Sequence, residues 1–169
     1  SIEVKHIIKK YRNVHNVNIN KPDKYGDTAF MLAAQKSNVE VIKYLYKTFG
    51  KKIKINKQNN DGQTAFMLAV NNTNVKVIKY LYNTFKDKID INKQDNNGDT
   101  AIMLATQNNV NIEVMQYLCN VFKKKIDINK QNNNGYTVLM LTAQNNPNIQ
   151  KIQYLYNTFK NAITVNKQS

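Results

Sequence analysis

The 169-residue chain lacks tryptophan and has only one cysteine, one arginine and two histidines. With Cys119 alone, no disulfide can form within the chain, so folding does not depend on an oxidising compartment. Two histidines and one cysteine do not make a zinc site of the usual spacing. No apolar run approaches the roughly 18–20 residues needed to cross a bilayer, and no signal peptide is visible. We therefore expect a cytoplasmic location.

Acidic residues are also scarce. The 25 Lys+Arg outnumber the 11 Asp+Glu, which leaves a formal charge of +14. Such a charge attracts nucleic acid, an anionic membrane or an acidic protein. Asn and Lys dominate the composition, and an A+T-rich genome would produce the same bias. The charge therefore has two explanations, a partner or codon composition.

One sequence pattern occurs four times along the chain. Gly26, Gly62, Gly98 and Gly135 lie 36, 36 and 37 residues apart, each inside the frame G-x-T-[AV]-x-M-L. Each frame is followed by an aromatic-rich segment such as VIKYLYNTF, and then by a segment such as IDINKQ. A fixed period of 20–50 residues indicates an array of stacked units rather than a globule with one core.

Each unit predicts two helices and an extended loop. Thr64 precedes a short apolar stretch and can cap a helix there. In the next stretch, residues 75–85, one helical face would carry Val75, Ile78, Leu81, Tyr82 and Phe85. The segment from Ile89 then alternates apolar and polar residues and ends in Asn-Gly, which tolerates the positive φ of a tight hairpin.

These units resemble the ankyrin repeat, whose signature T-P-L-H-x-A is matched here by Thr64 to Ala69. The resemblance covers essentially the whole chain and implies an all-α repeat solenoid, in which stacked helix-turn-helix units are joined by β-hairpin loops. We expect a single array over residues 1–169, with a partial repeat at 1–19, repeats at 20–55, 56–91, 92–128 and 129–165, and the start of a further repeat at 166–169.

The chain departs from the family pattern at the signature histidine. In the family that histidine hydrogen-bonds within the threonine turn, and a methionine replaces it here, so we expect that bond to be lost. The predicted role of the methionines is apolar filling between repeats; they are Met31, Met67, Met103 and Met140. The extra residues of each repeat predict a second helix about one turn longer, whose end is anchored by Phe49, Phe85, Phe122 and Phe159.

Nothing in the sequence predicts catalysis. The glycines punctuate repeats instead of forming a phosphate-binding loop, and the carboxylates do not converge. We expect no catalytic residue, no metal and no cofactor. Cys119 takes the place of a tyrosine in the second helix, so it is expected to be a buried packing residue. The tyrosine column is expected to be core with its hydroxyls at the rim; it comprises Tyr44, Tyr80, Tyr117 and Tyr154.

The resemblance also implies a binding surface, the concave face formed by the hairpin tips and the exposed side of the first helices. Transferred residue by residue, the expected partner-binding set is Lys24, Tyr25, Asp27, Gln35, Lys36, Asn60, Asp61, Gln63, Asn71, Asn72, Asn97, Asp99, Gln107, Asn108, Asn134, Tyr136, Gln144 and Asn145. This set is rich in amides, and its two lysines are offset by three aspartates.

A near-neutral, amide-lined surface favours a partner protein or peptide. A nucleic-acid protein would place Arg and Lys where the strand lies, so neither nucleic acid nor a membrane is the favoured partner. The alternatives are a structural spacer or scaffold segment of a larger protein, and a basic surface that contacts nucleic acid or anionic membrane.

The last repeat lacks the polar outer face that normally closes an array. Its second helix keeps Ile152, Leu155 and Phe159, and only Lys151 and the loop residues are more polar. We therefore expect either further repeats or end-to-end self-association between copies.

Overall fold

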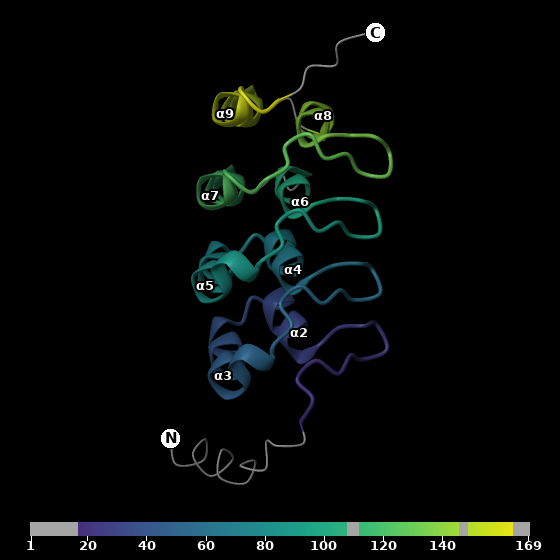
Figure 1. Ribbon diagram of the computed structural model, residues 1–169, viewed down its shortest axis with the longest axis vertical. Coiled ribbons are helices and arrows are strands. Elements are labelled where there is room, and N and C mark those ends of the chain that lie inside the picture. The colour runs from purple at the N-terminus through teal and green to yellow at the C-terminus, as the bar shows by residue number, and fades with distance from the viewer. Residues whose placement is uncertain (1–16, 108–111, 146–148, 164–169) are drawn as a thin grey trace.

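The computed structural model describes residues 17–107, 112–145 and 149–163. Over these residues the chain forms an elongated stack of paired helices (Figure 1). The helices are α2 (Ala29–Gln35), α3 (Val39–Phe49), α4 (Ala65–Asn71), α5 (Val75–Phe85), α6 (Ala101–Gln107), α7 (Ile112–Phe122), α8 (Val138–Asn145) and α9 (Ile149–Phe159), with 3-10 helices η2 (Gly50–Lys52) and η3 (Lys86–Lys88). The predicted all-α repeat solenoid is confirmed. Most of the expected partial repeat at 1–19 and all of residues 166–169 lie outside the described part.

The helices stand in two columns (Figure 1). The inner helices α2, α4, α6 and α8 pack on one another in succession, and each also packs on the outer helix of its own repeat. The predicted apolar face of the outer helix is buried, since Ile78 and Leu81 have no exposed surface and Phe85 is buried. Val77 is also fully buried and was missed. A helix in a stack is covered both by its inner partner and by the next outer helix, so its apolar face is wider than one stripe.

The methionines take part in capping the inner helices. The Thr28 hydroxyl accepts a hydrogen bond from the Met31 backbone N–H at 3.2 Å, and the Thr28 N–H points at the Met31 sulfur at 3.4 Å. The same pair of contacts joins Thr64 and Met67. The expectation that methionine loses the turn bond is therefore wrong. A thioether sulfur can accept a hydrogen bond, although a weak one, so it takes the place of the imidazole.

The methionine column is core in three of four repeats. Met31, Met67 and Met103 are each 1% exposed, as predicted, whereas Met140 is 43% exposed. Each of the first three is covered by the next inner helix of the stack. Among the described residues, no inner helix follows α8, so the prediction is wrong for Met140.

The outer helices end at the predicted phenylalanines. After Phe49 and Phe85 the extra residues form the 3-10 turns η2 and η3, so the expected additional turn is present but more tightly wound. Phe85 meets the ring of Phe30 edge-on at 5.7 Å and that of Tyr46 at 5.3 Å. Because Phe30 and Tyr46 belong to the preceding repeat, Phe85 packs two repeats together, and Phe122 does the same through Phe66 and Tyr82.

None of the described residues forms a β-strand, so the predicted hairpins are closed by turns. In the third loop the Asp95 N–H donates to the Asp99 carbonyl at 3.0 Å. The Asp95 carboxylate also accepts the N–H groups of Asn97 and Asp99, both at 2.9 Å. Asp23, Asn59 and Asn132 do the same in the other loops. One side chain thus satisfies the backbone donors that a strand ladder would otherwise satisfy.

Asparagines join each segment that follows an outer helix to the corresponding segment one period further along the chain. The side chain of Asn56 donates to the Lys88 carbonyl at 2.7 Å and accepts from the Asp90 N–H at 3.0 Å. Asn92 makes the same pair of bonds to Lys125 and Asp127. We call this row of bonds the amide ladder; it is formed by Asn20, Asn56, Asn92 and Asn129. Asparagine is therefore structurally required at these positions, whatever the codon bias.

Candidate functional site

The hairpin loops and the inner helices share one side of the stack, away from the outer helices (Figure 1). We call this side the loop face; it consists of loops 22–28, 58–64, 94–100 and 131–137 together with α2, α4, α6 and α8. Asn108 and the side chain of Asn145 lie outside the described part of the chain. The other predicted partner-binding residues lie in these loops or at the C-terminal ends of the inner helices.

Several of the predicted residues hold neighbouring repeats together. The Asn60 side chain donates to the Lys24 carbonyl at 3.0 Å, and the Asn72 side chain donates to the Gln35 carbonyl. Asp27 accepts from the Asn59 side chain at 2.8 Å. These contacts run between repeats, so the polar groups involved are already partly satisfied by the array.

Most of the remaining predicted residues are at least partly exposed to solvent, and Asp99 is the buried exception. Tyr25 is 60% exposed, and the Lys24 ammonium lies 4.8 Å from the centre of its ring. Tyr136 is 36% exposed, and Gln63 and Asn71 are half-buried. The other exposed members of the set are Gln35, Lys36, Asp61, Asn97, Asn134 and Gln144. An aromatic residue thus stands near each end of a surface that is otherwise amide-rich.

The loop face is hollowed between the third and fourth repeats. The hollow has a volume of about 450 Å³ and is lined by Asn97, Asp99, Gln107, Asn132, Asn133, Asn134, Tyr136, Leu141 and Gln144. Six of these residues belong to the predicted set. None of the lining residues is a lysine or arginine, although the chain carries a formal charge of +14.

Asp99 is the charged group of this hollow. It is only 6% exposed, and its two oxygens accept from the Asn132 side chain at 2.8 Å and the Gln107 side chain at 3.0 Å. Both donors are uncharged. Asn132 was not predicted as a site residue; the signal for it is that Asp23, Asn59 and Asp95 occupy the same turn position.

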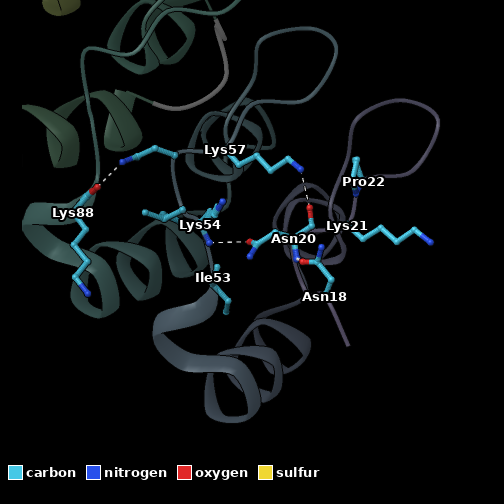
Figure 2. A pocket seen from close by; sticks show the side chains of 10 residues that line it. Asn18, Asn20, Lys21, Pro22, Ile53, Lys54, Lys57 and Lys88 are labelled. Carbon is cyan, nitrogen blue, oxygen red and sulfur yellow. Dashed lines mark hydrogen bonds between the residues drawn. The ribbon is translucent and has the colours of Figure 1, made fainter. Parts of the chain in front are cut away.

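A second hollow lies on the segments that follow the outer helices, and its rim is basic. It measures about 780 Å³ and is lined by Asn18, Asn20, Lys21, Pro22, Ile53, Lys54, Ile55, Asn56, Lys57 and Lys88. Lys57 donates to the backbone carbonyl of Asn20 at 2.7 Å, while Lys21 and Lys88 lie on different sides of the hollow and extend in different directions (Figure 2). The lysines therefore do not converge on one point as the ligands of a single anion would.

Two buried titratable groups lie outside the loop face. Cys119 has no exposed surface, which confirms it as a packing residue, and burial raises the pKa of its thiol to about 12. Lys151, which makes the last outer helix more polar in sequence, is 1% exposed, and its ammonium donates to the Thr106 carbonyl at 3.3 Å. Burial lowers the pKa of Lys151.

The tyrosine column follows the prediction except at its first member. Tyr80, Tyr117 and Tyr154 are half-buried and pack on the core, and the Tyr154 hydroxyl donates to Asn120 at 2.9 Å. Tyr44, in the first described repeat, is 46% exposed. The covered tyrosines contact the preceding outer helix, as Tyr117 does with Tyr82 and Tyr154 with Asn120, and among the described residues no outer helix precedes α3.

The described residues show neither a metal site nor a membrane-spanning helix. Within residues 17–107, 112–145 and 149–163, no three His, Cys, Asp or Glu side chains gather closely enough to hold a metal ion. In the same ranges, every helix is too short or too polar to span a bilayer.

Paired helices stacked at a period of about 36 residues, with hairpin loops on one side, define a solenoid repeat protein. A family model described as "Ankyrin repeats (3 copies)" matches residues 3–95 and 85–169. The chain belongs to the ankyrin repeat family. A comparison with curated proteins finds no match. Ankyrin repeats are generally protein–protein interaction modules without enzymatic activity.

Proposed function

We propose that this chain binds a partner protein through the concave side of the array, which corresponds to the loop face. The supporting observation is that Tyr25 and Tyr136 are 60% and 36% exposed there. Aromatic side chains are enriched at protein interfaces, since each buries a large area at a small cost in side-chain entropy. The surrounding amides can donate to and accept from a polypeptide surface.

The distribution of charge supports a protein partner over nucleic acid. The predicted partner-binding set holds only two lysines and three aspartates, and the sole arginine of the chain, Arg12, lies outside it. A surface that binds a phosphate backbone would concentrate lysine and arginine along the path of the strand. The loop face itself carries Lys24 and five aspartates, which are Asp23, Asp27, Asp61, Asp95 and Asp99. A face of this charge repels a phosphate backbone and suits a protein surface that is recognised by amides and tyrosines.

The test compares two triple variants in capture from the cells that produce the protein. The first variant, Tyr25→Ala, Gln63→Ala and Tyr136→Ala, alters the loop face. The matched control, Lys47→Ala, Asn83→Ala and Gln153→Ala, alters exposed residues of the outer helices. We expect the loop-face variant to lose the proteins retained by the wild type, whereas the control keeps them. Circular dichroism and thermal unfolding establish that both variants fold.

The opposite pattern, loss with the outer-helix variant alone, would overturn the proposal. Equal retention by both variants would favour the structural spacer or scaffold role. A nucleic-acid role is tested by titrating salt against a labelled oligonucleotide. If several phosphates are neutralised, the logarithm of the affinity falls steeply with the logarithm of the salt concentration; a flat response excludes that role.

A further inference from the structure

We infer that the hollow between the third and fourth repeats receives an arginine side chain of the partner protein. This inference rests on the proposed function and assigns one element of its partner. The hollow lies on the loop face, and its volume of about 450 Å³ falls within the 300–1,000 Å³ typical of binding pockets. It is therefore large enough to admit a long side chain.

The first argument is an uncompensated charge. The residue Asp99 is 6% exposed, and the hydrogen-bond partners of its carboxylate are two neutral amides. A buried carboxylate is costly unless a cation accompanies it. An ionised carboxylate accepts about four hydrogen bonds, so the bonds from Asn132 and Gln107 leave capacity for a donor that enters the hollow.

The second argument concerns the tyrosine at the rim. Lys24 lies over the ring of Tyr25 and Lys79 lies over that of Tyr117, at 4.8 and 5.5 Å. Tyr136 has no such cation among the described residues, although 36% of its surface is exposed. Its ring can therefore stack on a cation that arrives with a partner.

Arginine fits this combination better than lysine. A guanidinium is planar, so it can stack on the Tyr136 ring while its five N–H groups reach in several directions. The hollow offers acceptors in several directions as well, namely the Asp99 carboxylate and the side-chain amides of Asn97, Asn134 and Gln144. A lysine ammonium could pair with Asp99 but could not use the planar arrangement.

The experiment uses three small probes of matched shape. N-acetyl-arginine methylamide, its neutral isostere N-acetyl-citrulline methylamide and N-acetyl-lysine methylamide are titrated into the whole chain at equal ionic strength. Binding is followed through the backbone amide signals of Gln107, Tyr136 and Gln144 in two-dimensional NMR spectra. We expect saturable shifts with the arginine probe at a Kd of about 1–10 mM, and at least about tenfold weaker binding of the other two.

Two aspartate variants separate binding from folding. Asp99→Asn removes the charge from the hollow. Asp90→Asn removes the charge from an exposed carboxylate outside the loop face, where Asp90 accepts from the Asn92 N–H at 3.2 Å. We expect Asp99→Asn to weaken arginine binding at least about tenfold and Asp90→Asn to leave it unchanged.

Equal binding of arginine and citrulline, equal binding of arginine and lysine, no saturable shift up to about 50 mM, or equal losses in the two variants would each overturn the inference. The proposed function is judged separately. If the loop-face triple variant loses its partner while Asp99→Asn keeps the partner at full affinity, protein binding stands and the arginine assignment falls.

Discussion

The methionine at the third position of each inner helix has two roles in the described array. Its sulfur accepts a bond at the helix N-terminus, and its side chain fills the space beneath the next inner helix. A flexible thioether suits both roles, because it adapts to an irregular space and is polarisable. At the exposed Met140, the cap contact is the hydrogen bond from the Met140 backbone N–H to the Thr137 hydroxyl, at 3.4 Å.

We predict that Met67→Ala lowers the free energy of unfolding by about 2–5 kcal/mol, as expected for a buried large-to-small substitution. Met140→Ala is the matched control, since it makes the same change at a position that is 43% exposed, and should cost less than about 1 kcal/mol. Urea unfolding followed by circular dichroism measures both. Similar losses in the two variants would mean that the next repeat does not cover Met67.

The buried thiol predicts a particular dependence of stability on pH. Burial raises the Cys119 pKa from 9.0 to about 12. Below pH 9 the thiol is neutral in both states, so its contribution to stability is intact. Above pH 9 the unfolded chain ionises first and binds fewer protons than the folded chain, so stability falls by up to about 1.4 kcal/mol per pH unit.

We therefore expect Cys119→Val to lose stability less steeply than the wild type above pH 9. Burial also raises the pKa values of Tyr117 and Tyr154, and their contribution falls with pH in both proteins. The difference between the two urea unfolding curves, measured on either side of pH 9, isolates the cysteine. A difference that stays constant with pH would show that the thiol is accessible in the folded state.

At the scale of the helices and loops, the turn after each outer helix contains a position with unusual geometry. Gly50 adopts φ 50 and ψ −122 at the start of η2. Lys86 occupies the same position at the start of η3, with φ 40 and ψ −114. Side chains other than hydrogen are strained in this region, so the second turn stores strain that the first does not.

We predict that Lys86→Gly raises the free energy of unfolding by about 1 kcal/mol. Relief of about 1–3 kcal/mol of backbone strain exceeds the roughly 0.5–1 kcal/mol of extra chain entropy that glycine loses on folding. Gly50→Lys, the reverse change in the equivalent turn, should be destabilising. Thermal unfolding of both variants provides the test, and a destabilised Lys86→Gly protein would show that the lysine side chain makes a compensating contact.

Helix positions followed from the sequence because the apolar spacing in residues 75–85 has the helical period and Thr64 marks the start of the inner helix. The burial of Val77 did not follow, since it depends on a neighbouring repeat that covers a second side of the helix. The absence of strands did not follow either. The Asp95 side chain accepts hydrogen bonds from the loop N–H groups. Alternation of apolar and polar residues is the same whether a side chain or a neighbouring β-strand accepts those bonds, so the sequence cannot distinguish the two.

The loop face was predicted as a surface, and its hollow was not. The positions of Tyr25 and Tyr136 followed from the family pattern around each glycine. The hollow is bordered by the large Tyr136 side chain and by the buried Asp99. It also includes Asn132, which was not predicted because the partner-binding set was chosen by expected exposure and Asn132 is occupied with hydrogen bonds within the turn. Burial of Asp99 is a property of two adjacent repeats, so no single repeat reveals it.

At the scale of the whole molecule, the last repeat of the described stack differs from the interior repeats. Met140 and Tyr156 are 43% and 54% exposed, while Met67 and Cys119 at the equivalent positions of interior repeats are buried. Exposed apolar patches of this kind promote association.

We predict that copies of this chain associate through the face formed by α8 and α9. Each large apolar side chain covered by a second copy would contribute roughly 1.5–3 kcal/mol. Sedimentation velocity over a range of concentrations should show a dimer, and Met140→Glu with Tyr156→Glu should restore the monomer. A wild-type protein that stays monomeric at high concentration would contradict the prediction.

The amide ladder has a consequence for how such a chain can change length. Each ladder asparagine bonds to backbone groups one period further along the chain, and the residues that supply those groups differ, with Lys54, Asp90 and Asp127 at one position. Along this ladder, successive segments therefore recognise main chain, whatever side chains they carry. A unit can be duplicated, deleted or exchanged with its joints intact, so the surface residues of each repeat are free to diverge independently.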